Sequence, residues 1–221
     1  MQRPIASSVK KKFEEERARR ILAYIYPDKY QTACLSESPD IINVEADVGT
    51  EVTSAQRADI HESLSIASMV TGKRTEEIPE RRLDKLSKKI IVSKRSDGTL
   101  LAGTQAFWGE TFDFHRAHAS KTEKLNANHF QRFKENNLFI YAWMIDDDEL
   151  TEAIQKLTSQ SVHPAPMVSF DSIFVFDGER LVEVRRGCHI THTIPPEMMH
   201  TISEEAFKTV VGVSRNEYYG R

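Results

Sequence analysis

Two acidic residues, Asp40 and Glu51, are the strongest candidates for chemistry in this sequence. Carboxylates that are held on adjacent strands can bind a hard cation such as Mg²⁺ or Mn²⁺ through their oxygen atoms. Such an ion polarises a phosphate and lowers the pKa of a bound water. The alternative is that both acids are solvated residues at strand ends that take no part in chemistry.

The residues around these two acids predict a β-hairpin. Asp40 opens an apolar run at residues 41–44, and Glu51 lies in a second run at residues 48–53. Valines alternate with Glu51 in the second run, which places them on a core face and Glu51 on the opposite face. A hairpin of this length brings Asp40 and Glu51 to one edge of the sheet, so we expect the two carboxylates to lie close enough to share a cation.

Pro39-Asp40, followed by Glu51-Val52-Thr53, resembles the motif of the PD-(D/E)XK nuclease superfamily, which has the restriction-endonuclease-like fold. The resemblance implies a Mg²⁺-dependent enzyme that hydrolyses DNA phosphodiester bonds and binds its metal through Asp40 and Glu51. In that family a Lys two residues after the Glu acts on the attacking water, whereas Thr53 stands at this position here. Some members of the superfamily carry the Lys on a neighbouring helix instead.

Three residues are candidates to replace the missing Lys. Gln56 lies in the first turn of a helix that we expect over residues 55–70, and its alternative is a solvated position. Lys121 and Lys124 lie on a polar helix that we expect over residues 119–136. This helix precedes a continuous apolar run that is typical of a buried central strand, so it can pack beside the hairpin.

Glu14 is a third candidate metal ligand. Residues 9–26 predict an amphipathic helix, and at about 100° per residue Glu14 falls between Ile21 and Ile25, inside the apolar stripe. Either this end of the stripe is exposed, or Glu14 faces a polar pocket, since a buried acid is otherwise uncommon. In the resembling family a Glu of the first helix often joins the metal site.

The order of the predicted elements indicates an α/β or α+β fold with one central mixed sheet flanked by helices. The chain of 221 residues is expected to form a single domain over residues 1–221, with an inserted helix and loop region at about residues 72–118. The core of the resembling superfamily is a helix, a three-stranded meander that carries the Asp and the Glu, a second helix and a further strand.

The net charge of −3 argues neither for nor against binding to nucleic acid. Lys and Arg are nevertheless in local excess at residues 10–20 and 73–95, and residues 76–92 predict a basic helix. We expect DNA, if it binds, to contact these two faces, with an affinity that falls as salt rises.

Cys34 and Cys188 have no metal-like spacing, which favours free thiols in a reducing cytosol. No apolar run suggests a secretory signal or a membrane span. We therefore expect a cytoplasmic protein with no membrane partner, and a homodimer stays open. Because Thr53 replaces the motif Lys, the alternative function is a catalytically inactive member of the same fold that binds nucleic acid or protein.

Overall fold

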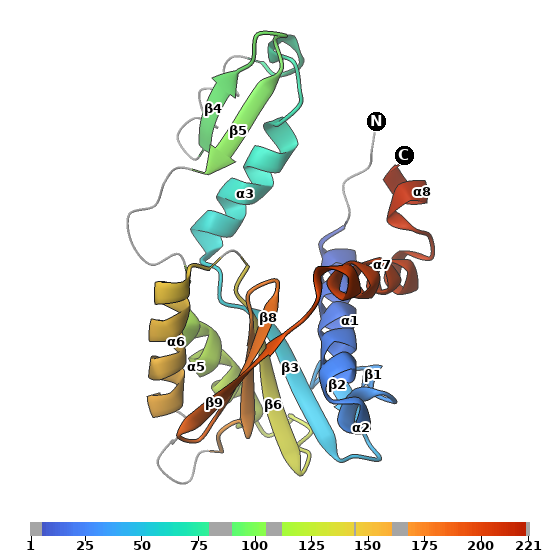
Figure 1. Ribbon diagram of the computed structural model, residues 1–221, viewed down its shortest axis with the longest axis vertical. Helices are drawn as coiled ribbons and strands as arrows, with labels where there is room; N and C mark the ends of the chain where they lie inside the picture. Colours follow the sequence, from blue (N-terminus) through green and yellow to red (C-terminus); the bar gives the residue numbers. More distant parts are fainter. Residues whose placement is uncertain (1–5, 80–89, 105–111, 144, 161–167, 220–221) are drawn as a thin grey trace. The chain divides into compact units, whose positions relative to one another are not determined.

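The computed structural model in Figure 1 describes residues 6–79, 90–104, 112–143, 145–160 and 168–219. The chain divides into two compact units, the first made of Met1–Ala55 and Phe114–Arg221 and the second of Gln56–Asp113. The second unit overlaps the insertion expected at about residues 72–118. It begins earlier than expected because the helix that follows Gln56 belongs to it.

The first unit contains a mixed sheet, which within the described residues has seven strands in the order β1-β2-β3-β6-β7-β8-β9. The strands are β1 (Cys34–Leu35), β2 (Ile41–Asn43), β3 (Val48–Ser54), β6 (Glu135–Tyr141), β7 (Ser172–Phe176), β8 (Arg180–Arg185) and β9 (Cys188–Thr193). The strands β1 to β3 form an antiparallel meander, β3, β6 and β7 are parallel, and β7 to β9 are antiparallel.

Helices cover both faces of this sheet, which confirms the predicted α/β or α+β class. They are α1 (Ser7–Ile25), α2 (Pro27–Tyr30), α5 (Phe114–Leu125), α6 (Asp147–Gln160), α7 (Pro196–Val211) and α8 (Arg215–Tyr219). Figure 1 shows α1 and α7 on one side of the sheet and α5 and α6 on the other. Among the described residues no helix has the length and apolar character that a membrane crossing requires.

The main core lies between α1 and the sheet. Ala18, Ile21 and Leu22 of α1 are fully buried and pack in one cluster with side chains of β3, β6 and β7, including Phe139 and Phe174. Burial of a side chain of the size of Leu or Phe contributes about 1.5–3 kcal/mol relative to its exposure. This packing fixes α1 against the strands that carry the two acids.

Both faces of β3 are buried, whereas the sequence predicted one core face and one open face. Residues 48–52 are all buried, because β3 lies between β2 and β6 and helices cover the sheet on both sides. Gly49 permits this close packing on the face of Glu51. A Cβ at Gly49 would lie 2.6 Å from Phe133 Cδ2 and 2.8 Å from Pro39 Cγ, which is closer than carbon atoms can approach.

The helix that carries Lys121 and Lys124 is earlier and shorter than expected. It begins at Phe114 and ends at Leu125, instead of spanning residues 119–136. The side chain of Asn126 donates to Thr122 O and to Val168 O, both at 2.8 Å, and these bonds hold the chain as it leaves the helix. These side-chain hydrogen bonds stabilise the end of the helix in place of a further helical turn. The spacing of apolar residues gives no sign of them.

The second unit consists of α3 (Ala58–Val70), a short 3₁₀ helix η1 (Thr75–Glu77) and an antiparallel hairpin of β4 (Ile90–Lys94) and β5 (Leu100–Thr104). Its small core includes Val70, Ile78, Ile90 and Leu100. The basic helix predicted over residues 76–92 is wrong at both ends, because the 3₁₀ helix η1 ends at Glu77, Ile78 is extended, and residues 90–92 form part of β4. Residues 80–89 of that prediction lie outside the described residues.

Candidate functional site

Asp40 and Glu51 face each other across β2 and β3. The antiparallel register pairs Ile41 with Thr50, which places Asp40, just before β2, opposite Glu51. Residues directly opposite in an antiparallel pair lie on the same face of the sheet. The Val52 N–H donates to Asp40 Oδ2 at 2.8 Å and fixes the carboxylate against β3. Both side chains are buried, with exposed fractions of 1% for Asp40 and 0% for Glu51.

Two lysines of α5 contact Glu51. Lys121 Nζ lies 2.6 Å from Glu51 Oε2 and 3.7 Å from Asp40 Oδ2. Lys124 Nζ donates to Glu51 Oε1 at 2.7 Å and to Oε2 at 2.9 Å. The two lysines are three residues apart, which places them on one face of the helix. The structure thus brings together Asp40, Glu51, Lys121 and Lys124, and one ammonium group contacts both carboxylates.

The acid that α1 adds to this cluster is Glu15. Lys11 Nζ lies 3.1 Å from Glu15 Oε1 and 3.6 Å from Asp40 Oδ1, so one lysine links the two carboxylates. Glu15 Oε1 is buried and, apart from this ion pair, makes no hydrogen bond. Burial raises the pKa of Glu15 above its usual value, and the negative charge of Asp40 raises it further, while Lys11 opposes both effects.

Glu14, the acid predicted from the sequence, is not part of this cluster. Its side chain is one-third exposed and lies 3.9 Å from Lys10 Nζ, and its backbone carbonyl accepts a hydrogen bond from Tyr141 Oη at 2.7 Å. The prediction of Glu14 as a metal ligand was wrong because it assumed that the buried stripe of the helix runs through Ile21 and Ile25.

The fully buried face of α1 includes Ala18 and Leu22. Glu15 lies three residues before Ala18 and seven residues before Leu22, and residues at these spacings share one face of a helix. A stripe drawn through Ala18 and Leu22 would have identified Glu15 from the sequence.

The remaining predicted residue, Gln56, belongs to the second unit. Its backbone forms an isolated antiparallel bridge with Phe112 of the same unit. Gln56 and the residues around Glu51 thus belong to different units. Thr53 lies in β3, two residues after Glu51, and pairs with Ile140 of β6.

The cluster balances three carboxylates with three ammonium groups. Its acids are Glu15, Asp40 and Glu51, and its lysines are Lys11, Lys121 and Lys124. Among the described residues, no group of three or more His, Cys, Asp or Glu is arranged to hold a metal ion. Mg²⁺ commonly takes only one or two protein carboxylates and completes its shell with water and substrate phosphate, so Asp40 and Glu51 are a sufficient donor set.

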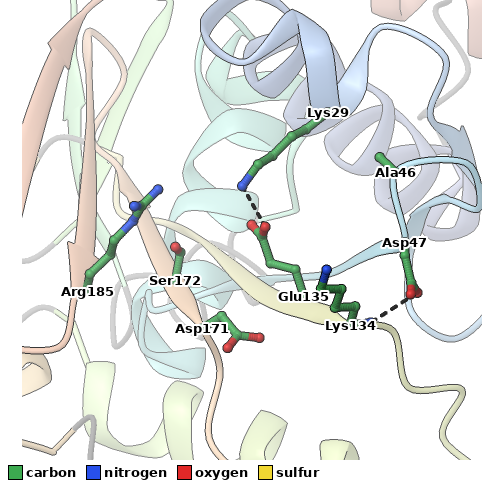
Figure 2. Close-up of a pocket in the computed structure, with 8 residues that line it drawn as sticks. All are labelled: Lys29, Ala46, Asp47, Lys134, Glu135, Asp171, Ser172 and Arg185. Carbon is green, nitrogen blue, oxygen red and sulfur yellow. Dashed lines mark hydrogen bonds and ion pairs between the residues drawn. The ribbon is translucent and has the colours of Figure 1, made fainter.

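A second polar site lies at the amino-terminal ends of the parallel strands β3, β6 and β7, and the sequence did not predict it. It is a pocket of about 380 Å³, shown in Figure 2, and it is lined by Lys29, Ala46, Asp47, Lys134, Glu135, Asp171, Ser172 and Arg185. Lys29 Nζ lies 2.5 Å from Glu135 Oε2. The backbone N–H of Lys134 donates to Asp47 Oδ1 at 3.0 Å, and that of Asn136 donates to Asp171 Oδ2 at 2.8 Å. The acids of this pocket are therefore already bound by groups of the chain itself.

A buried carboxylate, Glu183 of β8, lies next to this pocket. Its oxygens accept hydrogen bonds from Tyr26 Oη at 2.7 Å, Ser172 Oγ at 2.9 Å and Arg185 Nε at 2.8 Å. Burial alone would raise the pKa of Glu183, but the three donors outweigh it and hold that pKa below its usual value. Glu183 therefore stabilises the first unit as a charged acceptor.

Comparisons of the chain with protein-family models, with curated proteins and with solved structures find no match. The function must therefore be inferred from the residues and the geometry described above.

Proposed function

We propose that this protein is a metal-dependent nuclease that hydrolyses DNA phosphodiester bonds, as its resemblance to the PD-(D/E)XK superfamily implies. The observation that carries the proposal is that Asp40, directly after Pro39, lies opposite Glu51, which two lysines of α5 contact within 2.9 Å. The order α1, meander β1 to β3, α5 and β6 is also the order of that superfamily's core. This order supports the proposal.

Asp40 and Glu51 would hold Mg²⁺ or Mn²⁺. Their oxygens suit a hard cation, and they lie on one face of adjacent strands. The Glu15 carboxylate interacts electrostatically with Asp40, and Lys11 links the two acids. When bound, such an ion supplies a water of lowered pKa and polarises a phosphate oxygen.

Lys121 and Lys124 would supply the positive charge that the motif Lys provides in the resembling family. Their ammonium groups reach Glu51 from α5, which compensates for Thr53. Lysine side chains next to the metal ligands can donate hydrogen bonds to the attacking water and to the phosphate oxygens. Donors aimed at a developing negative charge lower the barrier because they need no reorganisation during the reaction.

DNA cleavage with Mg²⁺ or Mn²⁺ tests this proposal. The wild-type protein should cut single-stranded or double-stranded DNA, and Asp40→Asn and Glu51→Gln should not. Either Lys121→Ala or Lys124→Ala should lower the rate by about 10²-fold or more, the scale for loss of one transition-state donor. Glu45→Gln is the control, since Glu45 is an exposed acid at the hairpin turn. A wild-type protein that cuts no DNA with either ion contradicts the proposal.

The second candidate function is a catalytically inactive member of the same fold that binds nucleic acid or protein. Two observations favour it: Thr53 replaces the motif Lys, and lysines neutralise both buried acids. The same assay separates the two functions. An inert wild-type protein in which Thr53→Lys creates cleavage would identify a degenerate nuclease.

A further inference from the structure

We infer that Lys121 is a tethered cation that occupies the metal position of this site, so that a divalent ion binds only by displacing the Lys121 ammonium group. The inference rests on the proposed metal site at Asp40 and Glu51. It concerns how that site is regulated by its own chain, and it follows from the position and burial of the groups involved and from the length of the lysine side chain.

The position of Lys121 is the first argument. Its Nζ lies 3.7 Å from Asp40 Oδ2 and 2.6 Å from Glu51 Oε2, so a single positive charge bridges the two carboxylates. A divalent ion that used both residues as ligands would lie in this same space, since its oxygen ligands must approach within about 2.0–2.6 Å. An ammonium group and a metal ion cannot share that space.

Burial is the second argument. The exposed fractions of the Asp40 and Glu51 side chains are 1% and 0%, whereas that of the Lys121 side chain is 19%. Asp40 is also fixed by its hydrogen bond from the Val52 N–H. An ion from solvent therefore reaches the carboxylates when a lysine moves, and the lysine has the flexible four-carbon chain that such a movement needs.

The other two lysines of the cluster are less suited to this role. Lys124 contacts Glu51 and lies 5.9 Å from the centre of the Phe130 ring, and no contact of Lys124 with Asp40 is seen among the described residues. Lys11 contacts Asp40 and Glu15, but 65% of its side chain is exposed, so solvent screens its charge. Lys121 is the lysine seen to touch both proposed metal ligands.

Displacement of Lys121 has a measurable consequence. The free energy needed to remove its ammonium group from two buried carboxylates is subtracted from the free energy of metal binding. The wild-type site should therefore bind divalent ions more weakly than the same carboxylates would without Lys121. At low metal concentration the Lys121 ammonium group neutralises the two carboxylates. The metal concentration then sets the fraction of the protein that carries a metal ion at this site.

Calorimetric titration with Mn²⁺ tests this inference on the wild-type protein, on three lysine variants and on Asp40→Asn. Lys121→Gln should lower the Kd for Mn²⁺ by about tenfold or more, because it removes a like charge next to the ion. Lys121→Arg keeps that charge and should not lower the Kd. Lys10→Gln is the control, since Lys10 is an exposed lysine of α1 that pairs with Glu14 and is not one of the six residues of the cluster, and its Kd should stay within about twofold of wild type.

Two different failures can be told apart. If Mn²⁺ binds, Asp40→Asn abolishes the binding, and Lys121→Gln binds no tighter than wild type, the displacement of Lys121 is wrong and the metal site stands. If Lys121→Arg lowered the Kd for Mn²⁺ as much as Lys121→Gln does, the inference would also be overturned. The effect would then come from the shape of the side chain at position 121 and not from its charge. If neither wild type nor Lys121→Gln binds Mn²⁺, the proposed metal site fails and the inference with it. Circular dichroism of each variant checks that it is folded.

Discussion

At the scale of single residues, Glu15 is the acid of α1 that lies in the cluster with Asp40 and Glu51. Glu15 shares Lys11 with Asp40, whereas the adjacent Glu14 lies beside Lys10. Glu15→Gln should therefore weaken Mn²⁺ binding by several-fold up to about tenfold, because it removes a negative charge next to Asp40, the proposed ligand. Glu14→Gln, the neighbouring control, should leave the Kd within about twofold. A larger loss for Glu14→Gln in the same titration would restore the interpretation drawn from the apolar stripe.

Gly49 is the residue whose size matters most for β3. A Cβ at this position would lie 2.6 Å from Phe133 and 2.8 Å from Pro39, the residue that precedes Asp40. Gly49→Ala should therefore lower the free energy of unfolding by about 1–3 kcal/mol, the usual cost of overpacking. Urea denaturation measures the change. Gly103→Ala is the control, because a Cβ there meets no atom within 4 Å. Equal effects of the two substitutions would contradict the close packing at Gly49.

Glu183 predicts how stability depends on pH. The hydrogen bonds from Tyr26, Ser172 and Arg185 hold its folded pKa below the ordinary value of about 4.3. A lowered folded pKa gives stability that is fully present above the ordinary pKa and is lost as pH falls through the folded pKa. Glu183→Gln should be less stable than wild type at pH 7 by about 1–3 kcal/mol.

The difference between Glu183→Gln and wild type should shrink as pH falls below about 4.3, because the wild-type carboxylate becomes protonated. Urea denaturation of both proteins at several pH values measures it. A difference that stays constant from neutral to acidic pH would mean that the charge of Glu183 contributes nothing.

At the scale of elements, local patterns predicted the strands better than the helix ends. The apolar run that gives β6 and the Asp177-Gly178 turn that joins β7 to β8 both carry strong local signals, and both elements are present. β9 was not predicted, because its edge position leaves most of its residues exposed and its sequence has no apolar alternation. The boundaries of α5 failed because the chain leaves the helix through tertiary hydrogen bonds of Asn126.

The candidate site shows the same division between local and tertiary information. The sequence identified Asp40 and Glu51 because hairpin register follows from a short local pattern. It proposed Lys121 and Lys124 because their helix precedes the central strand, although its predicted bounds were wrong. The role of Glu15 was missed, because the buried stripe of α1 was drawn through Ile21 and Ile25 instead of through Ala18 and Leu22. That Gln56 belongs to the second unit became evident only from the fold.

The ion pairs between the lysines of α5 and Glu51 of β3 give a prediction about stability. Lys121→Met with Lys124→Met would leave the Glu51 carboxylate buried without its lysines, which should cost about 3–5 kcal/mol of stability. Adding Glu51→Gln removes the uncompensated charge and should restore a large part of that loss. Urea denaturation of the single, double and triple variants measures the coupling. If the triple variant is no more stable than the double, the ion pairs are not what the lysines contribute.

At the scale of the whole molecule, the structure narrows the basic face expected at residues 10–20. Arg17 is buried, with its guanidinium 4.1 Å from the centre of the Trp143 ring. Arg19 and Arg20 both donate to the buried Glu16, and Arg20 also pairs with Glu205. These arginines stabilise α1. The lysines at residues 10–12 are exposed, so they are the part of this face that can contact a phosphate backbone.

The second basic face lies in the other unit, where Lys73, Arg74, Lys94 and Arg95 are exposed among the described residues. Neutralised phosphates release counterions, so log K should fall linearly with log salt, with a slope of about −0.9 for each phosphate contacted. We expect steep salt dependence of DNA binding by the cleavage-deficient Glu51→Gln protein, measured by fluorescence anisotropy between about 50 and 200 mM salt. Replacing these four residues by Gln should make the slope shallower by up to about four phosphate contacts.

The controls for this last prediction use basic residues outside both faces. Lys156→Gln with Lys208→Gln changes the net charge in the same direction, on the exposed surfaces of α6 and α7. It should leave the slope unchanged, whereas Lys10→Gln with Lys12→Gln should make the slope shallower by about two contacts. If each set made the slope shallower in proportion to the number of charges that it removes, net charge, and not a defined face, would control the binding. Affinity that does not vary with salt, or no DNA binding at all, would favour a protein partner, because such binding needs no release of counterions from phosphate.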